Sequence, residues 1–344
     1  MAGPFYVDGS VGNDANAGTS EGSGNAWATI QKAADTAVAG EIVYVKASAD
    51  YAEDVDFDTN SGTAASRITF IGYTSTTTDG GKATITGGNT RAHCISLNGT
   101  ADYVTMRNFI LTSPTAHCVD VITATTAGWI FHNVHFLKGT GTSPTGAFGR
   151  SSGFNTITNL TMYRCLVKEF SSHGIGSPVL NLACDSCVII DNGGGGIVPS
   201  TYGGRFTVRR CVIANNTSDG INIPASTELV CCDSILNANG GDGIDIGGNT
   251  CRNIVITGNI FANHSGSGDT GLKIGTFSGT TTLLCDFNAY YNNTTDKSGT
   301  DTTGLNDIPL SADPFVNAGS DDWNINNDSG GGASLRASTL TMPA

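Results

Sequence analysis

The chain has 344 residues, of which 46 are glycine and only 14% are charged, and its formal net charge is −13. A chain of this length can bury a large core, but its 17 lysine and arginine residues do not supply the clustered positive charge that binding to a phosphate backbone requires. These numbers exclude nucleic acid as an expected partner, and no apolar run is long enough to predict a membrane partner.

The first predicted element is a polar loop near the N-terminus that carries oxygen ligands at short spacing. Asp8, Asn13 and Asp14 lie within residues 8–16, and their side chains are of the type that Ca²⁺ prefers. The loop lacks the spacing of an EF-hand and its closing glutamate. We therefore expect no cofactor, with Ca²⁺ at these three residues as the alternative.

Residues 27–40 are predicted to form a helix. Their apolar residues at 30, 33, 34, 37 and 38 fall on one helical face, and the segment ends at Gly40. An N-terminal helix of this kind can cap the open core of a stack of strands. The residues before it contain neither a basic n-region nor an apolar h-region, so no signal peptide is predicted. A mature secreted domain placed behind a start codon would look the same.

From residue 94 to residue 274 the chain repeats a phrase made of a small, an aliphatic, a variable and a second aliphatic residue. The first aliphatic residue recurs after 24, 56, 22, 24, 23 and 28 residues, and Gly146-Ala147-Phe148 is a degenerate copy inside the interval of 56. A period in the twenties built from short alternating strands is typical of a β-solenoid. The copies are Cys94–Leu97, Cys118–Val121, Gly174–Gly176, Gly196–Val198, Gly220–Ile223, Gly243–Ile246 and Gly271–Ile274.

A second family of strands keeps the same period and ends each time in a polar residue. Because parallel strands of successive coils lie about 4.8 Å apart, residues in one register form columns along the solenoid. Stacked asparagines at a corner can hydrogen-bond along such a column. The residues assigned to the corner are Asn108, Asn133, Ser186, Asp233 and Asn259. The residues that follow it are predicted to form a buried column, which consists of Val134, Cys165, Cys187, Cys211, Ser234 and Ile260.

The ten cysteines are predicted to be small buried hydrophobic residues rather than disulfide partners. Side chains stacked on parallel strands point the same way, which is poor geometry for a disulfide. Reduced thiols indicate a chain that folds in a reducing cytoplasm.

Three segments of a single all-β domain are predicted. Residues 1–50 hold the polar loop, the cap helix and the first strand; residues 51–297 form the coils; and residues 298–344 form a C-terminal cap or tail. The composition has no break that predicts a second domain.

Motifs at both ends of the chain resemble those of one superfamily. They are Phe5–Asp8, Gly12–Asp14, Thr29–Ala33, Gly40–Val45, Asp313–Val316 and Asp322–Ile325. Together with the coils they resemble the pectate-lyase-like right-handed parallel β-helix superfamily over nearly the whole chain. The resemblance implies a single-stranded right-handed parallel β-helix with three strands in each coil, and a solvent-facing strand surface where family enzymes bind polysaccharide. It does not imply one reaction, because the superfamily contains lyases, hydrolases, epimerases, phage tailspikes and inactive structural relatives.

Two aspartates one coil apart are the first candidates for catalysis. Asp219 and Asp242 each precede the glycine of a repeated phrase, so they are expected to lie side by side in a turn. Such a pair of carboxylates can supply the acid and the base of glycoside hydrolysis. The alternative, which we favour, is that each Asp-Gly makes the turn, with the aspartate bonded to its own backbone.

Asp245 and Lys273 are candidates for a lyase, because they occupy neighbouring places in an outward column. A lyase needs a base to remove the α-proton and a cation to stabilise the enolate-like intermediate. The alternative is an ordinary exposed ion pair, worth less than about 1 kcal/mol.

His93 and His117 are 24 residues apart, at matching positions before the first two phrases. Neutral imidazoles stacked in this way can converge on a transition metal ion. The alternative, which we favour, is a pair of side chains that pack in the turn.

These observations lead us to expect a non-enzymatic structural or binding protein, specifically a phage virion component such as a capsid decoration (cement) protein or a tailspike-like fibre. Its expected partners are other virion proteins or a surface polysaccharide, and its expected assembly is a homotrimer, as is frequent among β-helical phage proteins. The expected location is the virion, after folding in the host cytoplasm, with secretion as the alternative. The alternative function is a polysaccharide lyase or glycoside hydrolase that acts on an acidic glycan.

Overall fold

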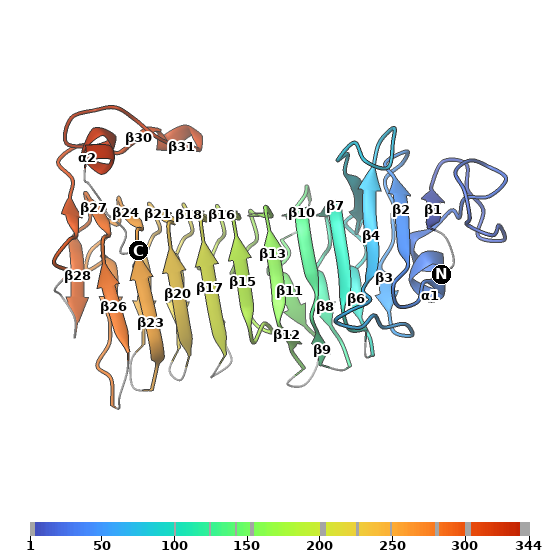
Figure 1. The fold of residues 1–344 in the computed structure, drawn as a ribbon, viewed down its shortest axis with the longest axis horizontal. Helices are drawn as coiled ribbons and strands as arrows, with labels where there is room; N and C mark the ends of the chain where they lie inside the picture. The colour runs from blue at the N-terminus through green and yellow to red at the C-terminus, as the bar shows by residue number, and fades with distance from the viewer. Residues whose placement is uncertain are drawn as a thin grey trace. The chain divides into compact units, whose positions relative to one another are not determined.

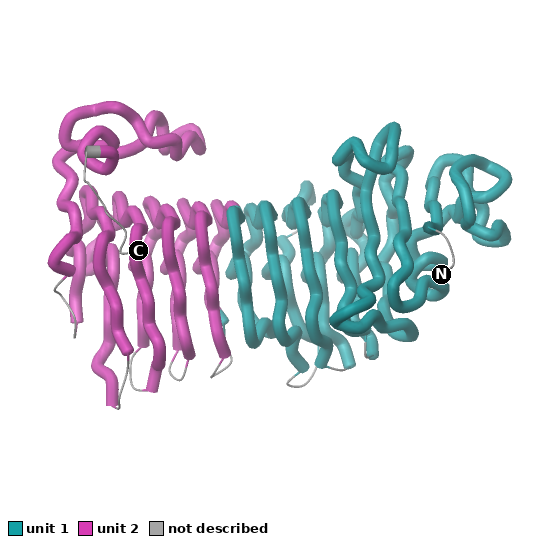
Figure 2. The backbone as a smooth tube through the Cα atoms, in the orientation of Figure 1, with its two compact units in different colours: residues 1–187, 199–201 teal, residues 188–198, 202–344 magenta. Residues whose placement is uncertain are grey.

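The computed structural model describes residues 4–99, 101–123, 125–141, 143–151, 155–199, 204–224, 227–247, 250–278, 282–299 and 304–337. The fold is an all-β parallel β-solenoid (Figure 1), which confirms the fold class that the repeated phrase predicts. It divides into two compact units, residues 1–187 with 199–201 and residues 188–198 with 202–344 (Figure 2).

In the first unit, strands pair in parallel with strands one coil further along the chain. They are β1 (Phe5–Asp8), β2 (Ile42–Lys46), β3 (Val55–Phe57), β4 (Ile68–Tyr73), β5 (Ala83–Thr86), β6 (His93–Leu97), β7 (Val104–Thr112), β8 (His117–Val121), β9 (Thr126–Ala127), β10 (Ile130–Leu137), β11 (Gly146–Arg150), β12 (Ile157–Thr158), β13 (Leu160–Tyr163), β14 (Leu166–Lys168) and β15 (Leu182–Asp185). β1, β2, β4, β7 and β10 pair in that order. β3, β6, β8 and β11 form a separate sheet.

In the second unit, three strands recur in each coil, as the resemblance implies. The strands are β16 (Val188–Ile190), β17 (Arg205–Arg209), β18 (Val212–Ala214), β19 (Ile221–Ile223), β20 (Glu228–Cys232), β21 (Ile235–Asn237), β22 (Ile244–Ile246), β23 (Arg252–Thr257), β24 (Ile260–Ala262), β25 (Thr270–Ile274), β26 (Leu283–Asp286), β27 (Ala289–Tyr291), β28 (Thr295–Gly299), β29 (Ile308–Pro309), β30 (Phe315–Asn317) and β31 (Asp322–Ile325). The three parallel series are β17-β20-β23-β26, β18-β21-β24-β27 and β19-β22-β25-β28. The alternate residues of these strands are buried and form the core of the unit.

Two short α-helices are present in the described part of the chain. α1 (Ile30–Thr36) is shorter at both ends than the predicted helix over 27–40. It begins three residues after the predicted start because the Asp14 carboxylate accepts hydrogen bonds from the backbone amides of Ala28 and Thr29. These bonds hold the two residues outside the helix. Its buried face packs against β1 and β3. No helix of the described residues is long and apolar enough to cross a membrane.

The predicted C-terminal segment, residues 298–344, is described in part. Residues 300–303 and 338–344 lie outside the described residues. The remainder contains β29, an antiparallel pair formed by β30 and β31, the 3₁₀ helix η1 (Ala318–Ser320) and α2 (Gly332–Ala337).

The predicted corner is a left-handed turn of the backbone. Four of the five residues assigned to it have positive φ angles, namely Asn108 (59°), Asn133 (56°), Ser186 (57°) and Asp233 (54°). In a fifth coil the corner residue is Gly258 (φ 70°), so the assignment of Asn259 was wrong by one position. Glycine and asparagine adopt positive φ most readily, which explains why both occur here.

The same one-residue error affects the buried column after the corner. Ile260 pairs with Ile235 in the register of β24 and β21, so the residue beside Ser234 is Asn259. Asn259 is buried, and its Oδ1 accepts the amide of Ser234 at 3.0 Å. A buried polar residue therefore continues the column, because its side chain is hydrogen-bonded there.

The cysteines are free thiols in the structure. Nine of the ten are buried, Cys232 being partly exposed. Burial raises the pKa of the Cys118 and Cys231 thiols well above the ordinary value. Both side chains thus serve as small core residues.

Candidate functional site

The three residues of the N-terminal loop make separate contacts with the loop and its neighbours. Burial raises the pKa of Asp8, but hydrogen bonds from Ser48 and Ser10 outweigh it and bring the pKa to about 2. Asn13 Oδ1 accepts the amide of Ala15 at 2.9 Å. The Asp14 carboxylate holds the start of α1, as described above. Each side chain has a structural role, and Ca²⁺ binding at this loop stays a prediction.

Asp219 and Asp242 lie in one column of the second unit, one coil apart, as predicted. Asp219 Oδ1 accepts a hydrogen bond from the backbone amide of Asp242 at 2.8 Å. Its Oδ2 accepts a hydrogen bond from Nδ2 of Asn222 at 2.7 Å. Asp242 Oδ1 in turn accepts the amide of Thr270 at 2.7 Å. The carboxylates thus bond the backbone of the next coil rather than their own turn, and they connect three successive coils.

Lys273 lies beside this column, between two carboxylates. Its Nζ is 3.1 Å from Asp242 Oδ2 and 2.8 Å from Asp245 Oδ2. The hydrogen bonds to Asp245 and Asp242 raise the pKa of Lys273, so the ammonium stays protonated and is not a base at neutral pH. Burial raises the pKa of Asp242 and outweighs the opposing hydrogen bonds from Lys273 and Thr270. The group combines a carboxyl of raised pKa with a cation whose side chain is 48% exposed.

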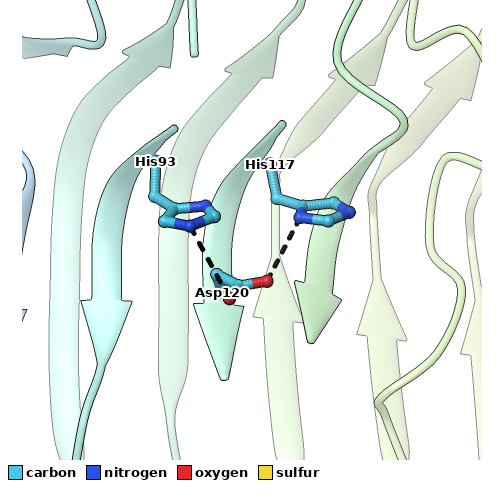
Figure 3. A group of neighbouring side chains, drawn as sticks. All are labelled: His93, His117 and Asp120. Carbon is cyan, nitrogen blue, oxygen red and sulfur yellow. Dashed lines mark ion pairs between the residues drawn. The ribbon is translucent and has the colours of Figure 1, made fainter. Parts of the chain in front are cut away.

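A second cluster lies in the first unit, on the adjacent strands β6 and β8 (Figure 3). His93 and His117 pair in the strand register, and their rings are stacked with centroids 6.0 Å apart and planes 5° apart. The carboxylate of Asp120, with no exposed surface, contacts both. Its Oδ2 is 3.7 Å from His93 Nε2, and its Oδ1 is 3.1 Å from His117 Nδ1.

Neighbouring residues hold the Asp120 and His117 side chains of the cluster. The Ser151 hydroxyl donates to Asp120 Oδ2, and Thr145 Oγ1 is 2.7 Å from His117 Nε2. Gly149 pairs with Asp120 in the register of β11 and β8, and a Cβ at Gly149 would collide with the ring of His117. Burial lowers the pKa of His93, which favours the neutral imidazole. Burial alone would raise the pKa of Asp120. The neighbouring His117 ring and Ser151 hydroxyl have the larger combined effect and bring the pKa below its ordinary value, so Asp120 is ionised.

Sequence reasoning identified His93 and His117 but did not connect Asp120 with them. In a regular strand, residues three apart face opposite sides of the sheet, so a regular strand would hold the Asp120 side chain away from His117. The alternation is broken in β8, where Cys118 and Val119 are both buried. Two consecutive apolar residues between a histidine and an aspartate were the signal in the sequence.

Comparisons with known proteins identify the fold. A family model described as "Right handed beta helix region" matches residues 93–287. No curated protein matches the chain. The crystal structure of pectate lyase Pel9A is 14% identical with a TM-score of 0.55, and the match covers 94% of this chain and 89% of that one. A GH136 lacto-N-biosidase from Eubacterium ramulus is 11% identical with a TM-score of 0.50, with 89% and 67% covered. At these identities the likeness shows the fold alone.

Proposed function

The chain belongs to the right-handed β-helix family, and from this premise we propose that it is a non-enzymatic structural and binding protein. The observation that supports the proposal is the use of Asp219 and Asp242. Each carboxylate accepts a backbone amide of the following coil. A general acid or base must instead reach the proton that it transfers.

Within this class we propose a phage virion component, a capsid decoration or tailspike-like protein that binds other virion proteins or a surface polysaccharide. The ten free thiols support folding in a reducing host cytoplasm before assembly. The net charge of −13 favours protein or glycan partners over nucleic acid. We also propose that α1 caps the N-terminal end of the core, because its apolar face is buried against β1 and β3.

The proposed assembly is a homotrimer, and its mass is the direct test. Light scattering after size exclusion should give three times the chain mass of 35.3 kDa. The mass should not change over a hundredfold dilution, because virion proteins assemble through large permanent interfaces. A mass of 35.3 kDa at every concentration would contradict the trimer.

The proposal predicts that the protein turns over no polysaccharide. A screen against acidic and neutral glycans, read by unsaturated uronate absorbance and by new reducing ends, should detect no product. Asp219→Asn and Asp242→Asn are the informative variants, and Asp328→Asn, at an exposed position, is the matched control. Activity that disappears in the first two variants and persists in the control would contradict the non-enzymatic proposal.

A second candidate function is a polysaccharide lyase or glycoside hydrolase that acts on an acidic glycan. It is favoured by Lys273, whose side chain is half-exposed and whose ammonium can bind a substrate carboxylate and stabilise an enolate-like charge. Asp242, with its raised pKa, is the candidate proton carrier of this group. The same screen separates the two functions, because this candidate requires product formation that Lys273→Met abolishes.

A further inference from the structure

We propose that His93, His117 and Asp120 bind a divalent transition-metal ion, for which Zn²⁺ is the probe. Two imidazoles and one carboxylate suit zinc, iron, nickel and copper. Calcium and magnesium are excluded as the resident ion because they take oxygen ligands. The inference concerns the first unit and is independent of the function proposed above.

The distances between the candidate ligand atoms fit such an ion. A tetrahedral site with bonds of about 2.1 Å holds neighbouring ligand atoms about 3.4 Å apart. The separations of 3.1 Å (His117 Nδ1 to Asp120 Oδ1) and 3.7 Å (His93 Nε2 to Asp120 Oδ2) lie on either side of that value, each ending on a different oxygen of the carboxylate. One ligand atom from each of the three residues lies within 4.8 Å of the others. To form the site, side-chain rotations must bring any pair of atoms near this limit closer together.

The orientation of the atoms favours a metal over a simple hydrogen bond. His117 Nδ1 and Asp120 Oδ1 are both buried, and neither has a hydrogen-bond partner of acceptable geometry, although they are only 3.1 Å apart. Thr145 Oγ1 lies 2.7 Å from the other ring nitrogen, Nε2, and can accept a hydrogen bond from it when Nε2 carries the proton. The tautomer with the proton on Nε2 leaves a lone pair on Nδ1. Metal-bound histidines are commonly oriented in this way, by an acceptor on the second nitrogen.

A permanent cation is missing from the contacts of Asp120 among the described residues. Its carboxylate has no exposed surface, and the basic groups beside it are the rings of the two histidines. A buried carboxylate is costly unless it is paired. Asp54, bonded to the Ser96 hydroxyl at 2.7 Å, adds negative charge nearby. A divalent ion would neutralise this group and join β6 to β8.

The test is a zinc titration of the full chain after dialysis against a chelator. Calorimetry should give one ion per chain with a Kd on the order of 1 μM or tighter, and saturating Zn²⁺ should raise the melting temperature, because the ion binds only the folded chain. His117→Gln and Asp120→Asn should each weaken binding at least tenfold. His135→Gln, a half-buried histidine on β10, is the matched control and should bind as the unchanged protein does.

Two results would overturn the proposal. One is the absence of stoichiometric binding by the unchanged protein, and the other is equal affinity in all three variants. If a variant fails to fold, Co²⁺ on the unchanged protein decides the question. Its visible absorption should report nitrogen and oxygen ligands, and its paramagnetism should shift the ring signals of His93 and His117. Shifted signals at other histidines alone would place the ion elsewhere.

Discussion

We expect Asn216→Ala to lower the free energy of unfolding by about 3 kcal/mol, because it removes the centre of a buried ladder of asparagines. Asn216 is 1% exposed. Its Oδ1 accepts the backbone amide of Asn192 at 3.2 Å and Nδ2 of the same residue at 2.8 Å. Its Nδ2 donates to Asn239 Oδ1 at 2.9 Å and to the carbonyl of Ile189 at 3.2 Å.

Alanine at this position leaves several of those buried groups without a partner, and each costs about 1–3 kcal/mol. Urea denaturation followed by circular dichroism measures the loss as a lower midpoint at constant slope. Asn222→Ala is the matched control, because Asn222 is half-buried and its side chain bonds only Asp219 among the contacts that the structure shows. Equal losses in the two variants, or a loss below about 1 kcal/mol at Asn216, would contradict the role of the ladder.

This ladder shows what the sequence leaves hidden. Stacked asparagines were predicted at the corner, and Asn133 Nδ2 does donate to Asn108 Oδ1 at 2.8 Å. The ladder through Asn216 was not predicted, because its members lie in polar segments that have the composition of an exposed turn, with glycine directly after Asn192 and Asn239. One coil further on, His264 takes the place after Asn239, and its Nε2 lies 3.1 Å from the carbonyl of Leu236. A change of residue type within the column conceals its continuity.

Register explains both the successes and the errors of the sequence analysis. The repeated phrase predicted the strands because each coil must return its apolar residues to one core. The same reasoning placed His93 beside His117 and Asp219 beside Asp242. It failed in one coil, where Gly258 and not the polar Asn259 lies at the corner in register with Asp233. It also did not predict the contact of Asp120, because two buried residues interrupt the alternation of β8. Period alone predicts which coils are neighbours, but local backbone geometry decides which side chains meet.

The largest loss is expected for Gly220→Ala, which should cost at least about 3 kcal/mol or prevent accumulation of folded protein. A Cβ at Gly220 would lie 2.6 Å from the carbonyl oxygen of Gly243 and 2.9 Å from Nδ2 of Asn239. This carbonyl is held in place, because it accepts a hydrogen bond from the backbone amide of Ile221 at 3.0 Å, which joins the two coils. Interiors packed at this density do not absorb an added methyl group without strain.

Gly319→Ala is the control for this substitution, since the nearest atom to a Cβ there is 3.8 Å away. It should leave the thermal midpoint within a degree or two of the unchanged protein, while Gly220→Ala should lower it sharply; similar midpoints would show that the coils can separate.

The small residue of the repeated phrase has two physical causes. In the second unit glycine is required by the carbonyl of the next coil. In the first unit Cys118 takes the same place, and its thiol donates to the carbonyl of Leu111 within the core. One sequence pattern thus combines a limit on coil spacing with a core contact, and the glycine copies of the second unit should be intolerant of alanine.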